Sequence, residues 1–249
     1  MKSLLVLLTT LVITLCFGCA DVKSPPQQKF SLSNYMDQST VALMAITGPN
    51  KSRTFCTASW IDKTFILTAG HCVQKENEDG EEESPLNSKI HYSVKGEVVE
   101  VDSQITGLHL AEVVAYDKAH DLALLHALGD VIPPHKIAKL ASTLPELGTH
   151  VYIVGHPKGL YFTHIEGVIS AYRTDEFPVS KRLGIKAAFI QVSSPGVYFG
   201  NSGGGLFNNN GEILGVCSLM TRAPNTSLFI NVDEVRLFLQ KYNETQDKK

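Results

Sequence analysis

An all-β fold with one helix near the C-terminus is predicted by two kinds of pattern in this 249-residue chain. Short runs rich in Val, Ile and Phe recur between turn residues, as in barrels and sandwiches. Asn210-Gly211 is a strong hairpin signal, because both residues tolerate a positive φ. A helix is predicted over residues 233–243, where apolar residues follow the N-cap candidate Asp233 at helical spacing: Val235, Phe238, Leu239 and Tyr242.

The candidate strands form two groups. The first group ends near residue 127 and comprises Val41–Ile46, Phe55–Ile61, Phe65–Ala69, Ile90–Val94, Val98–Val101, Ala111–Ala115 and Leu122–Leu125. The second begins near residue 148 and comprises Val151–Val154, Gly167–Tyr172, Ala187–Val192, Leu206–Phe207, Ile213–Ser218 and Ser227–Val232. Residues 128–147 contain Pro133, Pro134 and Pro145, so they are expected to link two β units.

Composition and charge indicate a globular protein and argue against nucleic-acid binding. Hydrophobic residues make up 43% and charged residues 19%, which is ordinary for a globular protein with a buried core. The formal net charge is −3, so a basic nucleic-acid surface is excluded as the leading interpretation and no nucleic-acid partner is expected.

The N-terminus has the pattern of an export signal over residues 1–18. Lys2 precedes an apolar run, Leu4 to Phe17, that is too short to span a bilayer comfortably. Its end, Gly18-Cys19, resembles the signal of bacterial lipoproteins, and this resemblance implies cleavage before Cys19 and acylation of the new N-terminal residue. The alternative is an ordinary signal peptide that contains cysteines.

Residues 19–39 are polar, include Pro25-Pro26, and are predicted to form a tether ahead of a domain over 40–243. More than one acyl chain on Cys19 would hold the protein at a membrane surface. The expected location is therefore the bacterial cell envelope or periplasm as a lipoprotein, or secretion. The oligomeric state has no signature in the sequence.

Three cysteines lie in the predicted domain: Cys56, Cys72 and Cys217. Two of three can pair in an oxidising compartment. A bridge between Cys56 and Cys72 would stabilise the fold by roughly 3 kcal/mol in the chain-entropy model. Cys217 would then remain, and its apolar neighbours favour a buried, inert thiol.

Residues typical of nucleophilic catalysis occur in three segments, at 68–72, 119–124 and 200–205. A serine hydroxyl needs a base to take its proton and a third group to orient that base. Ser202, His71 and Asp121 can supply these roles. The glycines around Ser202 allow the N–H groups of Gly200 and Ser202 to bind a developing oxyanion.

The order of these residues along the chain excludes two other hydrolase architectures. The pattern Gly200-x-Ser202-x-Gly204 also fits an α/β-hydrolase elbow, but that fold needs a histidine after the serine, and the last histidine is His164. The subtilisin order needs an aspartate in a matching context before His71, and none occurs. The order His-Asp-Ser belongs to the chymotrypsin type.

Asp121 is preferred over two other candidates, Asp117 and Asp102, for the orienting carboxylate. It directly precedes the apolar run Leu122–Leu125, where a strand would hold it against the histidine. The neighbouring His120 is expected to be structural, whereas the distant His156, in Gly155-His156-Pro157, is expected to lie on a loop without a required function.

From Val41 to Tyr242 the chain resembles the trypsin-like serine peptidases, and within them the Do-like, or HtrA-type, branch. The resemblance is carried by Thr68-Ala69-Gly70-His71-Cys72, Gly200-Asn201-Ser202-Gly203-Gly204, Gly167-Val168-Ile169-Ser170 and Asn210-Gly211-Glu212-Ile213-Leu214-Gly215. It implies two six-stranded antiparallel β-barrels, over about 40–127 and 148–232, with the active site in the cleft between them. It also implies polypeptide substrates, cleavage through an acyl-enzyme, and a disulfide between Cys56 and Cys72.

The chain departs from its relatives in three ways. Asn201 replaces the aspartate that digestive members use after zymogen cleavage, and no Ile-Val-Gly-Gly stretch occurs near Val41, so activity without such cleavage is predicted. The sequence ends at Lys249, where Do-like members usually continue into PDZ domains, so none is expected. Do-like members also usually lack the disulfide.

The primary specificity pocket is predicted from the same resemblance. Gly196 is expected at its floor, with Ser227 on one wall and Ser218, Leu219 and Met220 on the other. No acidic residue lies between Gln191 and Ser202, so a small to medium apolar side chain is expected before the cut. Cys217 stands where glutamate-specific members have a histidine, which disfavours that specificity.

Neither a cofactor nor a metal is predicted. The acidic run Glu76–Glu83 resembles the place of a calcium loop in some relatives, but its spacing is not a ligand pattern, and such runs are usually solvated. The chain lacks His-Glu-x-x-His, which argues against a metallopeptidase. An alternative function remains open: a non-catalytic binding module of the same fold, its pocket blocked by Tyr198 or Phe199.

Overall fold

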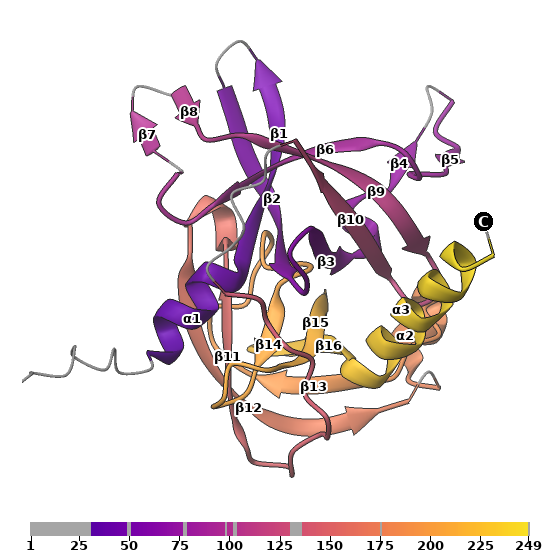
Figure 1. The fold of residues 1–249 in the computed structure, drawn as a ribbon. Coiled ribbons are helices and arrows are strands. Elements are labelled where there is room, and N and C mark those ends of the chain that lie inside the picture. The colour runs from indigo at the N-terminus through magenta and orange to yellow at the C-terminus, as the bar shows by residue number, and fades with distance from the viewer. Residues whose placement is uncertain are drawn as a thin grey trace, which may run out of the picture. The chain divides into compact units, whose positions relative to one another are not determined.

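The computed structural model describes residues 31–48, 51–76, 79–97, 99–101, 104–129, 136–174 and 176–248. Residues 31–249 form one compact unit. Its strands close into two six-stranded antiparallel barrels, and a helix follows at the C-terminus (Figure 1). The predicted fold class is thereby confirmed. The predicted signal peptide, Cys19 and residues 20–30 of the predicted tether lie outside the described residues.

The first barrel is formed by the N-terminal group of strands. Its strands in spatial order are β1 (Thr40–Gly48), β2 (Lys51–Trp60), β3 (Phe65–Ala69), β10 (Leu122–Leu128), β9 (His109–Asp117) and β6 (Lys89–Val94). Its core includes the edge-to-face pair Trp60 and Tyr92, whose ring centroids are 5.7 Å apart. Aromatic pairs of this geometry stabilise a core beyond the area that they bury.

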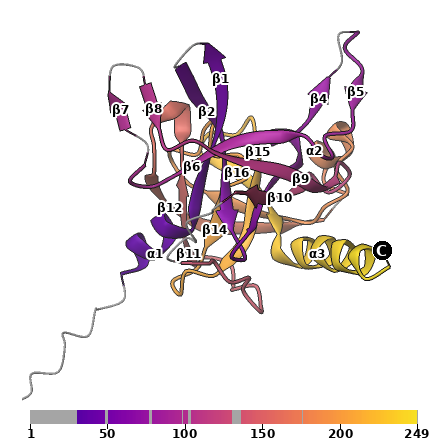
Figure 2. The ribbon, with the colours of Figure 1, turned by 45° about the horizontal axis from the view of Figure 1, so that its top comes forward.

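Two hairpins project from opposite sides of the first barrel (Figures 1 and 2). One consists of β4 (Lys75–Glu76) and β5 (Glu82–Glu83), in the predicted acidic loop. The other consists of β7 (Val99–Val101) and β8 (Gln104–Thr106). The strand expected at 98–101 therefore pairs with β8 and is not a barrel strand.

The second barrel is formed by the C-terminal group of strands. Its strands in spatial order are β11 (His150–Gly155), β12 (Thr163–Arg173), β13 (Phe189–Ser193), β16 (Thr226–Asn231), β15 (Ile213–Met220) and β14 (Gly205–Phe207). The hairpin predicted at Asn210-Gly211 joins β14 and β15, and Gly211 has a φ of 77°. A short helix, α2 (Pro178–Leu183), interrupts the chain between β12 and β13.

The C-terminal helix, α3 (Val232–Gln246), is longer than the predicted 233–243. Asn231, not Asp233, caps it, because the Asn231 side chain accepts a 2.8 Å hydrogen bond from the Asp233 backbone N–H. Phe238 is buried in the first barrel's core cluster, and the ring of Tyr242 contacts that of Phe65 edge-to-face. The apolar spacing thus predicted the buried face correctly, and the cap lies two residues earlier.

A further helix, α1 (Leu32–Ser39), lies within the segment expected to be a polar tether. Met36 is buried at 2% exposure, and the Tyr35 hydroxyl donates to the Ile137 carbonyl at 2.6 Å. The Asp37 carboxylate pairs with Lys95 of the first barrel and His164 of the second. Residues 32–39 therefore belong to the folded unit, because tertiary contacts outweigh their polar composition. Among the described residues, no helix is long and apolar enough to cross a membrane.

Candidate active site

His71 and Asp121 lie next to each other because their strands pair. His71 is in the one-turn 3-10 helix η1 (Gly70–Cys72) after β3, and Asp121 directly precedes β10. Strands β3 and β10 pair with Ala69 opposite Leu122. The Nδ1 atom of His71 lies 3.0 Å from both carboxylate oxygens of Asp121. The backbone N–H of His71 donates to the same carboxylate at 2.7 Å, so two bonds orient the histidine.

The backbone around this pair leaves little room for change. A Cβ at Gly70 would lie 3.0 Å from the Asp121 carbonyl carbon, which is tighter than side chains normally pack. Asp121 itself has a φ of 53°, in the left-handed region that few residues other than glycine adopt. This conformation is held by a 2.8 Å hydrogen bond from the Gly70 N–H to the Asp121 carbonyl.

The electrostatics of the pair favour a basic histidine. Burial lowers the pKa of His71, but the hydrogen bond and the negative charge of Asp121 outweigh burial, so the pKa is raised above 6.5. Asp121 is 5% exposed, and the hydroxyl of Ser218 also donates to it. Ser218 was predicted only as a pocket wall, since a lone serine in a strand gives no signal of a partner so distant in the chain.

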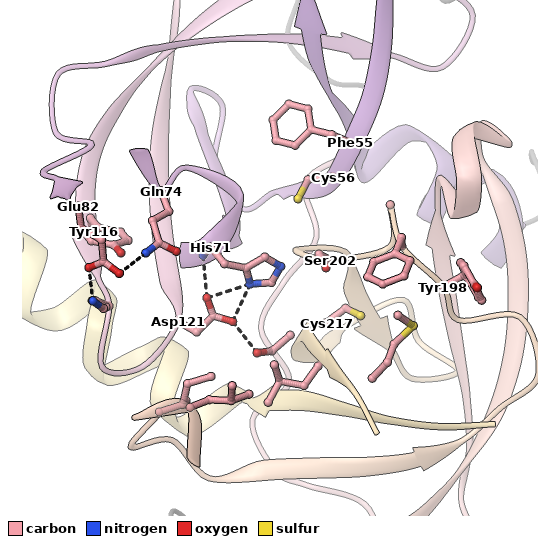
Figure 3. Close-up of a pocket in the computed structure, with 18 residues that line it drawn as sticks. Phe55, Cys56, His71, Gln74, Glu82, Tyr116, Asp121, Tyr198, Ser202 and Cys217 are labelled. Atoms are coloured by element: carbon pink, nitrogen blue, oxygen red, sulfur yellow. Dashed lines mark hydrogen bonds and ion pairs between the residues drawn. The ribbon is translucent and has the colours of Figure 1, made fainter. Parts of the chain in front are cut away.

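Ser202 lies in the loop between β13 and β14 of the second barrel. Its carbonyl accepts a 2.8 Å hydrogen bond from the Thr57 N–H of the first barrel, which joins the two barrels at this point. Ser202, His71 and Asp121 all line one cleft of about 720 Å³. Figure 3 shows His71 between Asp121 and Ser202. Among the described residues, no hydrogen bond joins the Ser202 and His71 side chains; in unliganded sites such bonds are often loose.

Around Ser202, some backbone N–H groups donate to carbonyls and others have no acceptor among the described residues. The N–H groups of Asn201, Gly203 and Gly204 donate to backbone carbonyls at 3.0, 2.7 and 2.9 Å. In the described part of the chain, no acceptor takes the N–H groups of Gly200 or Ser202. These are the two donors that the sequence predicts for an oxyanion, and both residues line the cleft.

Some of the residues predicted for the specificity pocket line the cleft, and others do not. Ser218, Leu219 and Met220 line the cleft, whereas Gly196 and Ser227 are not among its lining residues. Ser227 is 2% exposed in β16. A side chain at Gly196 would contact Ile165.

Several lining residues were not singled out from the sequence. They come from the first barrel with its loops and from the segment around α2: Phe55, Gln74, Tyr116, Lys118, Leu183 and Ile185. Glu82 of the predicted acidic run also lines the cleft. Tyr198 and Phe199 line the cleft and are 43% and 68% exposed. Lys118 and Tyr116 lie close to Asp121 in the chain, so their positions in the sequence could have indicated that they line the cleft. No sequence motif lies near Leu183 and Ile185, so the sequence did not indicate that these two residues line the cleft.

The cysteines follow the prediction. Cys56 and Cys72 form a disulfide, which confirms that pairing and places the bridge beside His71. Cys217 is free and buried, and burial raises the pKa of its thiol to about 12. Such a thiol stays protonated and unreactive at neutral pH.

Two groups of side chains have the residue types that bind metal ions, one beside His71 and one in the predicted acidic loop. Cys56, His71 and Cys72 come close enough together to share an ion, but the two sulfurs are bonded to each other, so they offer no thiolate ligand. In the predicted acidic loop, Glu82 accepts from Gln74 at 2.6 Å and pairs with Lys118. Glu82 is thus already neutralised by a cation of the chain.

The sequence matches a family model described as the trypsin-like peptidase domain over residues 56–216. Serine protease HTRA2, mitochondrial, of Drosophila pseudoobscura pseudoobscura is 35% identical over 140 residues, or 55% of this chain and 31% of the relative. Serine protease HtrA-like of Staphylococcus aureus (strain MRSA252) is 29% identical over 195 residues, or 75% of this chain and 22% of the relative. The chain therefore spans less than a third of either relative's length.

Solved structures share the fold at lower sequence identity. The active form of the Rv3671c protease from M. tuberculosis superposes with a TM-score of 0.63 at 21% identity, covering 85% of this chain and 83% of that one. The serine endoprotease from Yersinia pestis gives a TM-score of 0.60 at 20% identity, covering 85% and 65%. Both are evidence for the double-barrel fold.

Proposed function

Because the chain belongs to the trypsin-like peptidase domain family, we propose that it is an exported serine endopeptidase that cleaves polypeptides through an acyl-enzyme. The observation that carries the proposal is the bonded pair of His71 and Asp121 in one cleft with Ser202. A base held by a carboxylate next to a serine is the arrangement that activates a hydroxyl.

In the proposed reaction, Ser202 Oγ attacks the carbonyl carbon of the substrate, and His71 Nε2 takes the hydroxyl proton. Asp121 stabilises the resulting imidazolium, while the N–H groups of Gly200 and Ser202 bind the oxyanion. The intermediate collapses, His71 gives the proton to the leaving amine, and an ester to Ser202 remains. Water then attacks this ester with His71 again as base, which releases the acid and restores the hydroxyl.

Activity without zymogen cleavage is part of the proposal. It is supported by the Gly200 and Ser202 N–H groups, which no acceptor takes in the described part of the chain, and by Asn201 in place of an aspartate. Asn201 is fully buried, where an unpaired carboxylate would be costly and an amide costs less.

Covalent labelling tests the proposed activity. The purified chain is treated with a fluorophosphonate, which reacts with activated serines. We expect labelling that Ser202→Ala abolishes and that Ser170→Ala, an exposed serine on the same barrel, leaves intact. A folded chain that resists labelling would instead favour the non-catalytic binding module.

The cleft supports a preference for apolar residues before the cut. Leu219, Met220 and Phe199 lie along it, and its carboxylates belong to Asp121 and Glu82, both already paired. Cleavage of a peptide library should therefore favour Ala, Val or Leu over Arg, Lys and Asp at that position. A preference for basic residues would contradict this assignment.

We also propose that Cys19 carries a lipid that holds the enzyme at the bacterial envelope. This part rests on the N-terminal sequence alone. Mass spectrometry of the mature N-terminus should find acylation that Cys19→Ser removes and Cys16→Ser keeps. A mature chain that starts elsewhere, without lipid, would favour an ordinary signal peptide.

A further inference from the structure

His156 is a fully buried histidine that the proposed reaction does not use. It follows β11, is 0% exposed, and packs its ring edge-to-face on Phe162 at 4.9 Å. Its Nδ1 atom lies 2.8 Å from the hydroxyl of Thr57 in the first barrel. Its Nε2 atom is buried without a hydrogen-bond partner among the described residues. A polar ring in such a place calls for an explanation, since burial of unpaired polar atoms is costly.

The Thr57 hydroxyl decides which nitrogen of His156 carries the proton. Thr57 is fully buried, and its hydroxyl donates to the Gly200 carbonyl at 2.6 Å. A hydroxyl has one proton, so it can only accept from His156. Nδ1 of His156 is therefore the N–H donor, and the two side chains form a directed chain of hydrogen bonds that ends at Gly200.

Gly200 is held from the same side by the turn after His156. Its φ of 103° belongs to the left-handed region, and a Cβ there would lie 2.2 Å from the His156 carbonyl oxygen. The carbonyl of Phe199, in the peptide unit that also contains the Gly200 N–H, accepts a 2.8 Å hydrogen bond from the Lys158 N–H. Because the C=O and N–H of one peptide unit point in opposite directions, this bond directs the Gly200 N–H away from the turn.

We propose that Thr57 and His156 are positioning residues which, with the Lys158 N–H, hold the peptide units on both sides of Gly200 and keep its N–H aimed at the oxyanion. The inference rests on the proposed serine endopeptidase function. Glycine rotates more freely than other residues, so these bonds supply the rigidity that Gly200 lacks. Preorganised donors are effective because they need no reorganisation during the reaction.

The protonation state of His156 suits this role. Burial lowers its pKa to about 3, so the ring is neutral over the range in which a serine peptidase works. A neutral ring with the proton on Nδ1 keeps its direction of donation as pH changes. No charge is introduced behind the oxyanion site.

The first test replaces the hydroxyl of Thr57. Thr57→Val keeps the shape of the side chain but removes the donor to Gly200, and Thr57→Ser keeps the donor. For Thr57→Val we expect kcat and the rate of fluorophosphonate labelling to fall roughly 10- to 100-fold with little change in KM, because only the transition state carries the oxyanion. Thr57→Ser should restore most of the rate.

The second test changes His156 and keeps Thr57. An asparagine side-chain amide can present an N–H close to the place of Nδ1, whereas leucine fills a similar volume with no donor. His156→Leu should therefore lower kcat with KM nearly unchanged, and His156→Asn should stay within a few-fold of the original chain. Thermal unfolding identifies any variant that does not fold.

The outcomes separate this inference from the function on which it rests. If the unaltered chain is neither labelled nor active, the proposed function fails. If the unaltered chain is active and folded Thr57→Val and His156→Leu keep its kcat and labelling rate, the positioning role is wrong. The positioning role is also wrong if Thr57→Ser loses as much kcat as Thr57→Val, and His156→Asn as much as His156→Leu. A hydrogen-bonding role predicts that the serine and asparagine variants keep most of the rate.

Discussion

His71 of the first barrel and His156 of the second both follow a barrel strand, yet they have opposite properties. Each lies at the end of a strand, β3 or β11, at a 3-10 turn: η1 (Gly70–Cys72) or η2 (Pro157–Gly159). The Asp121 carboxylate lies beside the His71 ring, and the pKa of His71 is raised. His156 is buried against the Thr57 hydroxyl, and its pKa falls to about 3.

The difference shows how the surroundings decide what a histidine can do. A charged partner within hydrogen-bond distance makes a base, whereas burial with a neutral partner makes a fixed donor. In the proposed reaction, the first barrel supplies the group that takes a proton, and the second supplies the loop that binds the oxyanion. Each of the following experiments tests one side of this contrast.

The largest effect is expected for His71→Ala. Removing the base leaves Ser202 without a group to take its proton, so kcat should fall by about 10⁴- to 10⁶-fold. Steady-state kinetics on the peptide cleaved by the unaltered chain measures the loss. His150→Ala, an exposed histidine of β11, is the matched control and should keep full activity. A His71→Ala variant with ordinary activity would remove His71 from the reaction.

The next effect concerns the bridge that fixes the His71 turn. Replacing Cys56 and Cys72 by alanine opens a link between residues separated by 16 positions. The free energy of unfolding should drop by about 3 kcal/mol in the chain-entropy model. Denaturant titration with and without reductant tests it: reductant should destabilise the original chain and leave the double variant unchanged. A double variant as stable as the oxidised chain would contradict the expectation.

The pH dependence of stability tests the buried histidine. Between pH 6.5 and 3 the unfolded chain protonates His156 and the folded chain resists it, so stability is lost as pH falls. The stability difference between the original chain and His156→Leu should therefore change by up to about 1.4 kcal/mol per pH unit, with the original chain losing more. Urea unfolding at pH 7 and pH 5 measures it, and a difference independent of pH would show that His156 titrates normally.

The smallest effect is a displacement of the pH profile. The proposed reaction requires neutral His71, and Asp121 raises the pKa of His71, so the acid limb of kcat/KM should lie above pH 6.5. The pairing of protonated His71 with Asp121 also stabilises the folded chain below pH 6.5. This stabilisation is lost as the pH rises through the raised pKa of His71. In Asp121→Asn the burial of His71 remains without the charge, so the limb should move to lower pH.

The control for this shift is Asp62→Asn, an exposed carboxylate outside the cleft. That variant should keep the limb of the original chain. An Asp121→Asn limb at the original pH would separate Asp121 from the titration of His71.

Local patterns were sufficient for the features that depend on neighbours in the chain. Short runs rich in Val, Ile and Phe predicted the barrel strands, and Asn210-Gly211 predicted its hairpin. The segment around His71 predicted the disulfide through its resemblance to a known family. The helix α1 was missed because its residues are mostly polar and its docking depends on Lys95 and His164, far along the chain.

The sequence alone determined the residue types available for catalysis, and its short motifs carried the resemblance to a family. The two-barrel fold was predicted through that resemblance. The sequence also separated His71, as the candidate base, from His156, but only the tertiary structure showed that His156 is buried and bonded to Thr57. Thr57 and Gly200 are 143 residues apart, and His156 and Thr57 are 99 apart. Hydrogen bonds over such separations form only when the barrels close and pack together, and local periodicity carries no information about them.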